Sequence, residues 1–291
     1  MKKVGLIGYG YWGSKLARCF KDLGALTVIA DRDGNRSNRA MQEQDVPSYS
    51  TVEAILNYGD PVDAIAIATP PETHYDIARQ VLNEGKDVFI EKPMTTSFGE
   101  AEALRKQAGA QGRSLMVGHI YLHNNGIQAM PIPVGQAELY VQLLNEKGGP
   151  SPSTRDVLWA GLPHACSLAL HFFPDMPERV EAIEAKREGE RIKARLEYWN
   201  GSVAYLDVGD NTGRKLRRVE LRVGDTRNNF DVGFPNLCQI TSGMNSRTVE
   251  GPNEEPLLTE CKAFLEYQGV DPMGPKVVKL IEDIQQCLKL T

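Results

Sequence analysis

A glycine-rich turn near the N-terminus has the spacing of a phosphate-binding loop. The residues that fit the pattern G-x-G-x-x-G are Gly8, Tyr9, Gly10, Tyr11, Trp12 and Gly13. They stand directly after an apolar run that predicts a strand and at the start of a predicted helix, which is the context that this pattern needs. Gly8 permits the tight turn, Gly10 lets the backbone approach a pyrophosphate, and Gly13 lets the helix lie close to the strand. We therefore predict a nicotinamide dinucleotide site here, with a glycine-rich turn that binds no ligand as the alternative.

An acidic residue stands where the adenosine ribose of such a cofactor would bind. Asp31 ends the second predicted strand, 18 residues beyond Gly13, and a carboxylate at this place accepts hydrogen bonds from the ribose hydroxyls. Because a carboxylate repels a 2′-phosphate, Asp31 favours NAD over NADP. Arg32 keeps NADP open, since a guanidinium can bind that phosphate. The alternative is that Asp31 caps a helix or forms a turn.

Two clusters of polar residues follow later predicted strands. Ligands of open α/β sheets bind beyond the carboxyl ends of the strands. The residues that we expect to line the cofactor site are Thr69, Pro70 and His74 in the first cluster, and Glu91 and Lys92 in the second. The Lys92 ammonium can hydrogen-bond a substrate oxygen and stabilise the negative charge that develops on it. The alternative for Lys92 is an ordinary surface lysine.

Together these motifs resemble those of the Gfo/Idh/MocA family, named for glucose-fructose oxidoreductase and inositol dehydrogenase. The resemblance is carried by G-Y-G-Y-W-G at 8–13, A-T-P-P-E-T-H at 68–74 and E-K-P at 91–93. It implies a Rossmann domain followed by an α+β domain with an open sheet, which in such proteins commonly mediates oligomerisation. For Lys92 it implies contact with both the nicotinamide and the reacting hydroxyl group.

A histidine in the second half of the chain is the other candidate catalytic residue. The segment 156–164, D-V-L-W-A-G-L-P-H, resembles the family segment whose histidine faces the nicotinamide, in the form found in nucleotide-sugar dehydrogenases. The resemblance implies that His164 is the acid or base, and an imidazole can exchange a proton with an alcohol near neutral pH. Ala160 and Ala165 stand where the family pattern carries aspartates, and this departure weakens substrate binding or proton relay.

The remaining histidines do not predict a metal site. His119 and His123 follow a strand end, where a spacing of four residues does not bring side chains together, so we expect them to line the cleft. His171 shares a helical face with His164 and is expected to pack in the core or to cap a helix. We therefore expect no bound metal.

The predicted elements of the first half belong to an α/β domain. Short apolar runs alternate with helical segments and predict strands at 3–8, 26–31, 62–69, 87–91 and 114–119, in a parallel sheet covered on both faces. Leu16, Cys19, Phe20 and Leu23 form the apolar stripe of the first helix. Another helix follows Thr73 and ends at Gly85.

The sequence pattern of the second half predicts an α+β domain with a largely antiparallel open sheet. Alternation with a period of two is clearest in 191–198, 202–208 and 219–223, with a hairpin turn at Asn200-Gly201. Helices are predicted at 157–173, 256–268 and 274–290, the last packing on the first domain, and a loop beside the cleft at 145–155. We therefore predict an NAD(P)-binding Rossmann domain at 1–121 and an α+β substrate and oligomerisation domain at 122–291.

The composition excludes several classes of protein. A formal net charge of −5 gives no attraction to a polyanion, so nucleic acid is not an expected partner. The five cysteines are far apart and include no C-x-x-C pair, which argues against disulfides and a structural zinc site and suits a reducing cytoplasm. No stretch is long enough to span a membrane. A cytoplasmic protein that acts on a small molecule is expected.

The expected function is hydride transfer between the nicotinamide of NAD or NADP and a secondary alcohol or ketone of a sugar or nucleotide-sugar. Lys92 would polarise the oxygen and His164 would relay its proton. Ala160 and Ala165 would also suit a non-catalytic dinucleotide sensor, because a fold alone does not determine an activity. Reduction of a C=N or C=C bond, which short family members such as biliverdin reductases perform, is the other alternative, although it needs no base for an alcohol.

Overall fold

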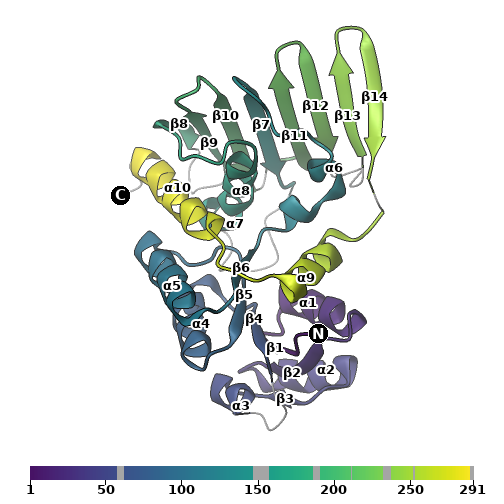
Figure 1. Cartoon of the computed structure of the whole chain (residues 1–291), viewed down its shortest axis with the longest axis vertical. Helices are drawn as coiled ribbons and strands as arrows, with labels where there is room; N and C mark the ends of the chain where they lie inside the picture. Colours follow the sequence, from purple (N-terminus) through teal and green to yellow (C-terminus); the bar gives the residue numbers. More distant parts are fainter. Residues whose placement is uncertain are drawn as a thin grey trace. The chain divides into compact units, whose positions relative to one another are not determined.

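A computed structural model of the chain describes residues 1–57, 62–146, 157–185, 191–210, 212–231, 237–251 and 253–288. By its internal contacts the chain divides into two compact units (Figure 1). The first unit holds Met1–Gly118 and Leu257–Pro275, and the second holds His119–Pro256 and Lys276–Thr291. One division thus lies close to the predicted boundary at 121, whereas the return of 257–275 to the first unit has no counterpart in the prediction.

The first unit contains a six-stranded sheet with the strand order β3-β2-β1-β4-β5-β6, in which every pair is parallel. The strands are β1 (Val4–Ile7), β2 (Leu26–Ala30), β3 (Ser48–Tyr49), β4 (Ala64–Ile67), β5 (Asp87–Glu91) and β6 (Leu115–Gly118). The strand order reverses between β1 and β4, which is the ligand-binding crevice of a Rossmann fold. The predicted parallel Rossmann sheet is confirmed, and only the two-residue strand β3 was not predicted.

Helices pack on both sides of this sheet, with α4 and α5 on one side and α1 and α2 on the other (Figure 1). The helices of the unit are α1 (Tyr11–Asp22), α2 (Gly34–Gln44), α3 (Val52–Leu56), η1 (Pro71–Thr73), α4 (His74–Asn83), α5 (Phe98–Gln111) and α9 (Pro256–Glu266). Phe264 of α9 packs edge-on against Phe20 and Phe89, with ring centroids 6.2 and 5.5 Å away. A helix from far along the chain therefore completes the core beside α1.

The second unit contains an eight-stranded sheet with the order β14-β13-β12-β11-β7-β10-β9-β8. Its strands are β7 (Glu138–Leu144), β8 (Arg179–Ala185), β9 (Arg191–Glu197), β10 (Val203–Gly209), β11 (Leu216–Val223), β12 (Thr226–Asp231), β13 (Leu237–Ser242) and β14 (Asn245–Glu250). Only β7 and β10 pair in parallel. The prediction of a largely antiparallel sheet is confirmed, with the β9–β10 turn at Gly201, where φ is +78°.

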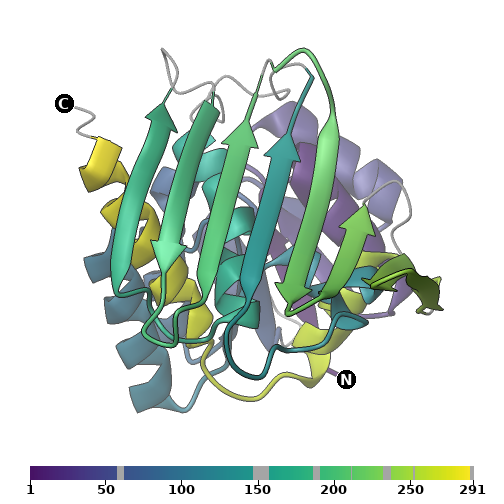
Figure 2. The same cartoon turned by 90° about the horizontal axis from the view of Figure 1, so that it is seen from above.

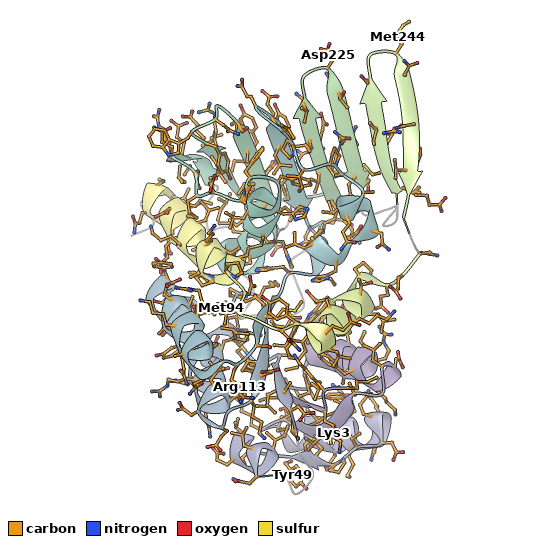
Figure 3. All side chains as sticks on the ribbon, viewed as in Figure 1. Lys3, Tyr49, Met94, Arg113, Asp225 and Met244 are labelled. Atoms are coloured by element: carbon orange, nitrogen blue, oxygen red, sulfur yellow. The ribbon has the colours of Figure 1, made fainter. Side chains whose placement is uncertain are left out.

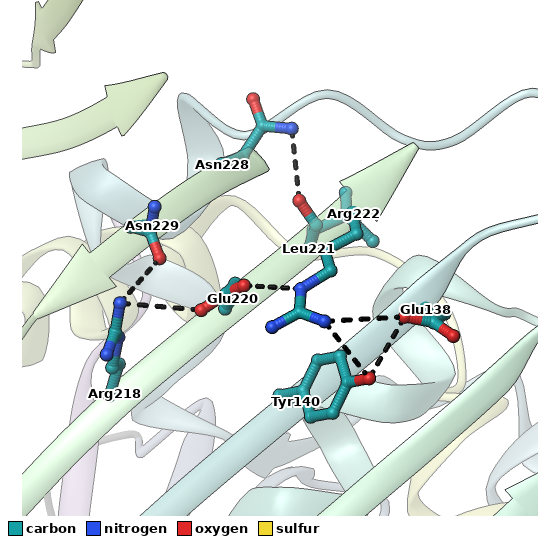
Figure 4. Close-up of polar contacts among 8 residues, drawn as sticks. All are labelled: Glu138, Tyr140, Arg218, Glu220, Leu221, Arg222, Asn228 and Asn229. Atoms are coloured by element: carbon teal, nitrogen blue, oxygen red, sulfur yellow. Dashed lines mark hydrogen bonds and ion pairs between the residues drawn. The ribbon is translucent and has the colours of Figure 1, made fainter. Parts of the chain in front are cut away.

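The two faces of this sheet differ in chemistry. Buried Leu139, Val141 and Leu143 of β7 lie on the face that we call the inner face, and they alternate with side chains of the outer face such as Tyr140 and Gln142. Figure 2 looks onto the strands, with α10 behind them in yellow. The outer face carries ion pairs and polar hydrogen bonds among β7, β11 and β12 (Figure 4).

The second unit also contains η2 (Ile120–His123), α6 (Asn125–Gln128), α7 (Val157–Ala160), α8 (Leu162–Phe172) and most of α10 (Met273–Leu288). The helix predicted at 157–173 is thus two helices separated at Gly161. The Lys276 amine donates to the Pro174 carbonyl at 2.8 Å, and the Cys287 thiol donates to the Val180 carbonyl at 3.3 Å. From Lys276 onward the last helix is part of the second unit, whereas its first residues and α9 are part of the first.

Two hairpins end in exposed turns, at Asp225 between β11 and β12 and at Met244 between β13 and β14 (Figure 3). Most of the loop predicted at 145–155 lies outside the described residues, from 147 onward. Among the helices of the described part of the chain, none combines the length and the apolar character needed to cross a bilayer.

Candidate active site

The glycine-rich turn joins β1 to α1 with room for a phosphate. Gly8 has a φ of +96°, and a Cβ on it would lie 2.6 Å from the Ala68 carbonyl oxygen. A Cβ on Gly13 would lie 2.0 Å from the Gly8 carbonyl oxygen, whereas one on Gly10 would meet no atom within 4 Å. Gly10 is the N-cap of α1 and no side chain caps this helix, so the N–H groups of its first turn are available to an anion. These residues fit the pyrophosphate of a dinucleotide.

Asp31 lies next to this turn, directly after β2. Its Oδ2 accepts a hydrogen bond from the Tyr9 backbone N–H at 2.7 Å, and its Oδ1 accepts one from the Asp33 N–H at 2.9 Å. The N-cap of α2 is Asp33, whose side chain accepts hydrogen bonds from the backbone of Asn35 and Arg36. Asp31 is therefore not the cap of α2, whereas its bond to the Asp33 N–H is of the kind found in turns, which was the other part of its alternative interpretation. Arg32, between the two aspartates, is exposed.

The three large side chains of the turn have different surroundings. Tyr9 is fully buried, and its hydroxyl donates to Glu43 at 2.6 Å and accepts from Gln44 at 2.8 Å. Burial is the main reason that the pKa of Tyr9 rises to about 12. Tyr11 is 66% exposed, and Trp12 points to the end of β5. The Tyr9 side chain thus packs against α2, and its backbone forms part of the turn.

His74 connects the two polar clusters that follow β4 and β5. Its Nε2 lies 2.9 Å from the Thr69 carbonyl oxygen and its Nδ1 lies 2.8 Å from the Pro93 carbonyl oxygen. Carbonyl oxygens only accept hydrogen bonds, so the imidazole donates through a ring nitrogen that carries a hydrogen, and a neutral ring has one such nitrogen. His74 is 1% exposed. It therefore contacts the backbone of both Thr69 and Pro93 from a buried position.

Glu91 joins the glycine-rich turn to Lys92. The Trp12 indole N–H donates to Oε1 of Glu91, and the Lys92 backbone N–H donates to Oε2 at 3.1 Å. Burial raises the pKa of Glu91 to about 7, against the opposing effects of the Lys92 ammonium and the Trp12 hydrogen bond. Lys92 is half-buried, and its peptide bond to Pro93 is cis. The predicted cofactor turn and the predicted catalytic lysine therefore share one hydrogen-bond network.

A second buried carboxyl group, Glu260 of α9, lies near this network. Glu260 is 0% exposed, and its pKa is raised by burial and by the negative charge of Glu91. Its other ionisable neighbours are the thiols of Cys19 and Cys261. Glu260 was not predicted as a site residue, although a glutamate on the apolar stripe of a helix was an available signal. We call Trp12, Glu91, Lys92 and Glu260 the Lys92 cluster.

His164 lies in the first turn of α8, in the second unit, against Tyr121 of η2. The two ring centroids are 5.0 Å apart with an interplanar angle of 65°. The His164 backbone carbonyl accepts a hydrogen bond from the Ser167 hydroxyl at 2.9 Å, and the imidazole is half-buried. Tyr121 was not singled out from the sequence, although it stands between His119 and His123. We call His119, Tyr121, His123 and His164 the His164 cluster.

Burial determines the properties of the other two histidines of this cluster, His119 and His123. His119 is 4% exposed, and the pKa of His123 is lowered to about 4 by burial, with a smaller contribution from the charge of His119. Within the described residues, no group of three histidine, cysteine or acidic side chains is arranged to hold a metal ion.

Two other residues of α8 were considered from the sequence. The ring of His171 packs on the ring of Phe172, with centroids 4.9 Å apart. Ala165 is fully buried in α8.

Comparison with known proteins identifies relatives of this chain. Residues 2–119 match the sequence model of an oxidoreductase family with an NAD-binding Rossmann fold. The UDP-N-acetylglucosamine 3-dehydrogenase of Acidithiobacillus ferrooxidans is 31% identical over 225 residues, which are 75% of this chain and 70% of that protein. A solved structure of that enzyme superposes with a TM-score of 0.89 at 23% identity, over 98% of this chain and 97% of that one.

Other relatives carry different names. The 2,7-anhydro-N-acetylneuraminate hydratase of Escherichia coli is 31% identical over 233 residues, which are 72% of this chain and 62% of that protein. A levoglucosan dehydrogenase in complex with NADH and levoglucosan has the same fold, with a TM-score of 0.84 at 17% identity over 98% of this chain and 96% of that one. The fold is thus shared by proteins that act on different sugar derivatives.

Proposed function

Because the chain belongs to the Gfo/Idh/MocA family of NAD-binding oxidoreductases, we propose that it transfers hydride between NAD(P) and a secondary alcohol or ketone of a sugar or nucleotide-sugar. The named substrates of its relatives, UDP-N-acetylglucosamine and levoglucosan, support this substrate class. The observation that carries the proposal is the hydrogen bond from Trp12 to Glu91, which connects the glycine-rich turn to Lys92.

The first unit offers the residues that would hold the dinucleotide. Gly8, Gly10 and Gly13 leave the N-terminus of α1 open for the pyrophosphate, and Asp31 beside them would accept the ribose hydroxyls. Asp31 supports NAD as the preferred cofactor, and the exposed Arg32 leaves NADP as the second choice. When bound, the dinucleotide supplies the hydride acceptor or donor.

Lys92 would bind the reacting oxygen of the substrate. Its backbone is held by Glu91, its neighbour Pro93 is held by His74, and its side chain is half-buried. An ammonium held in this way stabilises negative charge on the oxygen of an alcohol that loses hydride or of a ketone that receives it. Lys92 would therefore be the group that touches the reacting oxygen.

His164 would move the proton of the same oxygen. Its ring is half-buried and rests against the edge of Tyr121, which limits its orientations. A positioned imidazole can accept a proton from an alcohol and return one to a ketone. Lys92 and His164 would then act together although Ala160 and Ala165 stand at the positions of the family aspartates.

The direct test measures turnover with NAD and with NADP on a panel of sugars and nucleotide-sugars, followed by the absorbance of the reduced nicotinamide. Dinucleotide binding is measured separately by fluorescence titration. We expect binding and turnover on at least one compound of the panel. Tight binding of NAD without hydride transfer to or from any of them would instead support a dinucleotide sensor, the alternative that Ala160 and Ala165 motivate.

The outer face of the second sheet would join two copies of the chain. Tyr140 stacks on Tyr205 with ring centroids 4.8 Å apart, and Arg222 bonds Glu220 and Tyr140 (Figure 4). These contacts hold the side chains in fixed positions, which lowers the entropy cost of an interface. Exposed Ile183 of β8 adds apolar area to the same face.

Light scattering tests this interface. Tyr205→Glu would place a charge against the stack and should shift the protein toward a smaller species, whereas Met244→Glu at an exposed hairpin tip should leave the mass unchanged. An unchanged mass in both variants would contradict the proposed interface. In the described part of the chain none of the five cysteines forms a disulfide, which supports our proposal of a reducing, cytoplasmic location.

A further inference from the structure

One arginine interrupts the apolar inner face of the second sheet. Val219 and Leu221 of β11 are fully buried on this face, and the alternation of the strand places Arg217 on the same side. The next residue, Arg218, lies on the outer face, where it pairs with Glu220 at 3.4 Å (Figure 4). A charged residue at an apolar position of a strand needs a partner, because burial of a charge alone is costly.

The register of the sheet places Arg217 near the first turn of α8. Arg217 pairs with Leu143 of β7, and Leu143 pairs with Val208 of β10, so the three side chains form one row across the inner face. Neighbouring strands lie about 4.8 Å apart, which places Arg217 about 10 Å from Val208 along that row. A Cβ on Gly161, at the start of α8, would lie 3.4 Å from the Cβ of Val208. Arg217 and His164 are therefore at the same end of the inner face.

The Arg217 guanidinium is held in place by an amide instead of a carboxylate. It donates a hydrogen bond to Oδ1 of Asn145, whose own amide donates to Asp210 at 2.5 Å. Across the described ranges, no ion pair of Arg217 with a carboxylate occurs. The half-buried guanidinium thus uses one donor on Asn145, with the Asp210 carboxylate on the far side of that amide, and has its other donors for another group.

Tyr121 stands between this cation and the candidate acid or base. Its ring contacts the His164 ring at 5.0 Å, and its hydroxyl is close enough to Arg217 that the positive charge lowers the pKa of Tyr121, against the larger opposite effect of burial. The three residues come from η2, α8 and β11 of the same unit. Tyr121 therefore has His164 and the Arg217 cation as neighbours.

We propose that Arg217 binds an oxyanion of the substrate, a carboxylate or a phosphate carried by the same sugar whose hydroxyl group reacts beside His164. This inference rests on the proposed function and narrows its substrate class to anionic sugars. The guanidinium fork matches both oxyanions in a bidentate manner, and a neutral sugar would leave this charge without a counter-ion.

Binding of anionic and neutral probes tests the inference without turnover. Calorimetric titration of the full chain, saturated with NAD, would compare D-glucuronate, glucose 1-phosphate and D-glucose. We expect at least one anionic probe to bind about 10-fold more tightly than glucose or better. Preference for glucuronate would identify a carboxylate as the ligand, and preference for glucose 1-phosphate would identify a phosphate.

Three variants assign the effect to Arg217. Arg217→Gln should weaken the preferred anionic probe about 10- to 100-fold and leave glucose unchanged. Arg217→Lys keeps the charge and should therefore retain part of the preference for the anionic probe over glucose. If Arg217→Gln does not fold, Arg217→Lys takes its place in the test. Arg214→Gln removes the same charge from an exposed turn and should bind like the parent chain.

The outcomes separate this inference from the proposed function. Unchanged anion binding in Arg217→Gln, or an equal loss for glucose and the anionic probes, would overturn the inference even if hydride transfer to neutral sugars occurs. Anion binding that depends on Arg217 in a chain that turns over no sugar would uphold the inference and contradict the proposed function.

Discussion

The Lys92 cluster and the His164 cluster both consist of buried and half-buried side chains, but they are built differently. Glu91 receives hydrogen bonds from Trp12 and from the Lys92 backbone, so directed bonds hold the Lys92 cluster. In the His164 cluster the His164 ring lies edge-on to the ring of Tyr121. The first arrangement gives a defined position to one charge, and the second gives a largely apolar surface to an imidazole.

Burial also moves the acids and bases of the two clusters toward their neutral forms, with opposite consequences near neutral pH. The Glu91 pKa rises to about 7, whereas the His123 pKa falls to about 4. The usual assignment of neutral-pH titration to histidine therefore does not hold for His123. Glu91, a carboxyl group of the Lys92 cluster, instead has a pKa near 7.

The largest expected effect comes from removing the Lys92 ammonium group. Lys92→Ala should lower kcat/KM about 1000-fold, as the loss of a donor to a developing oxyanion does, while NAD binding stays within about twofold of the parent chain. Steady-state kinetics and fluorescence titration check the two parts. Lys106→Ala, an exposed lysine of α5, is the control. Turnover that survives in Lys92→Ala would remove Lys92 from the mechanism.

Removing the imidazole of the other cluster should have a smaller effect. His164→Ala should lower kcat about 100-fold, at the lower end for a general acid or base, because Lys92 still stabilises the charge on oxygen. His171→Ala, in the same helix, should affect stability more than kcat. Equal kcat values for the two variants would show that His164 has no special role in proton transfer.

The next expected effect is a pH dependence of stability that comes from Glu91 in the Lys92 cluster. Because the raised Glu91 pKa lets the folded state keep a proton that the unfolded state releases, the free energy of unfolding should fall as pH rises from 4.5 to about 7. A shift of this size corresponds to about 3 kcal/mol. Denaturant unfolding of Glu91→Gln between these pH values should show a smaller fall, and Glu84→Gln, an exposed site, should behave like the parent chain. Parallel curves for all three proteins would contradict the assignment.

Cofactor selectivity gives the smallest expected effect. Asp31→Ser removes the carboxylate that opposes a 2′-phosphate and should shift the ratio of the NADP and NAD dissociation constants about 10-fold toward NADP. Asp33→Ser keeps a good helix cap and serves as the control. If both variants shift the ratio equally, the selectivity belongs to the general charge of this region and not to Asp31.

Much of the first unit was predictable because its determinants are local. The glycine spacing at 8–13 and the apolar runs predicted five of the six strands, and Gly8 and Gly13 stand where any side chain would meet the backbone. The alternation of 191–198 and 202–208 likewise predicted the antiparallel pair β9 and β10. Patterns of this kind follow from the geometry of a single helix or strand, so a sequence carries them without tertiary information.

The tertiary structure alone decided which distant residues meet. Glu260 comes near Glu91 because α9 returns to the first unit, and Arg217 shares a row with Val208 only through the register of three strands. The break at Gly161 and the place of α10 in the second unit were decided at the same level. Side chains that act by burial and by through-space charge depend on neighbours from other segments, and local spacing contains no information about those neighbours.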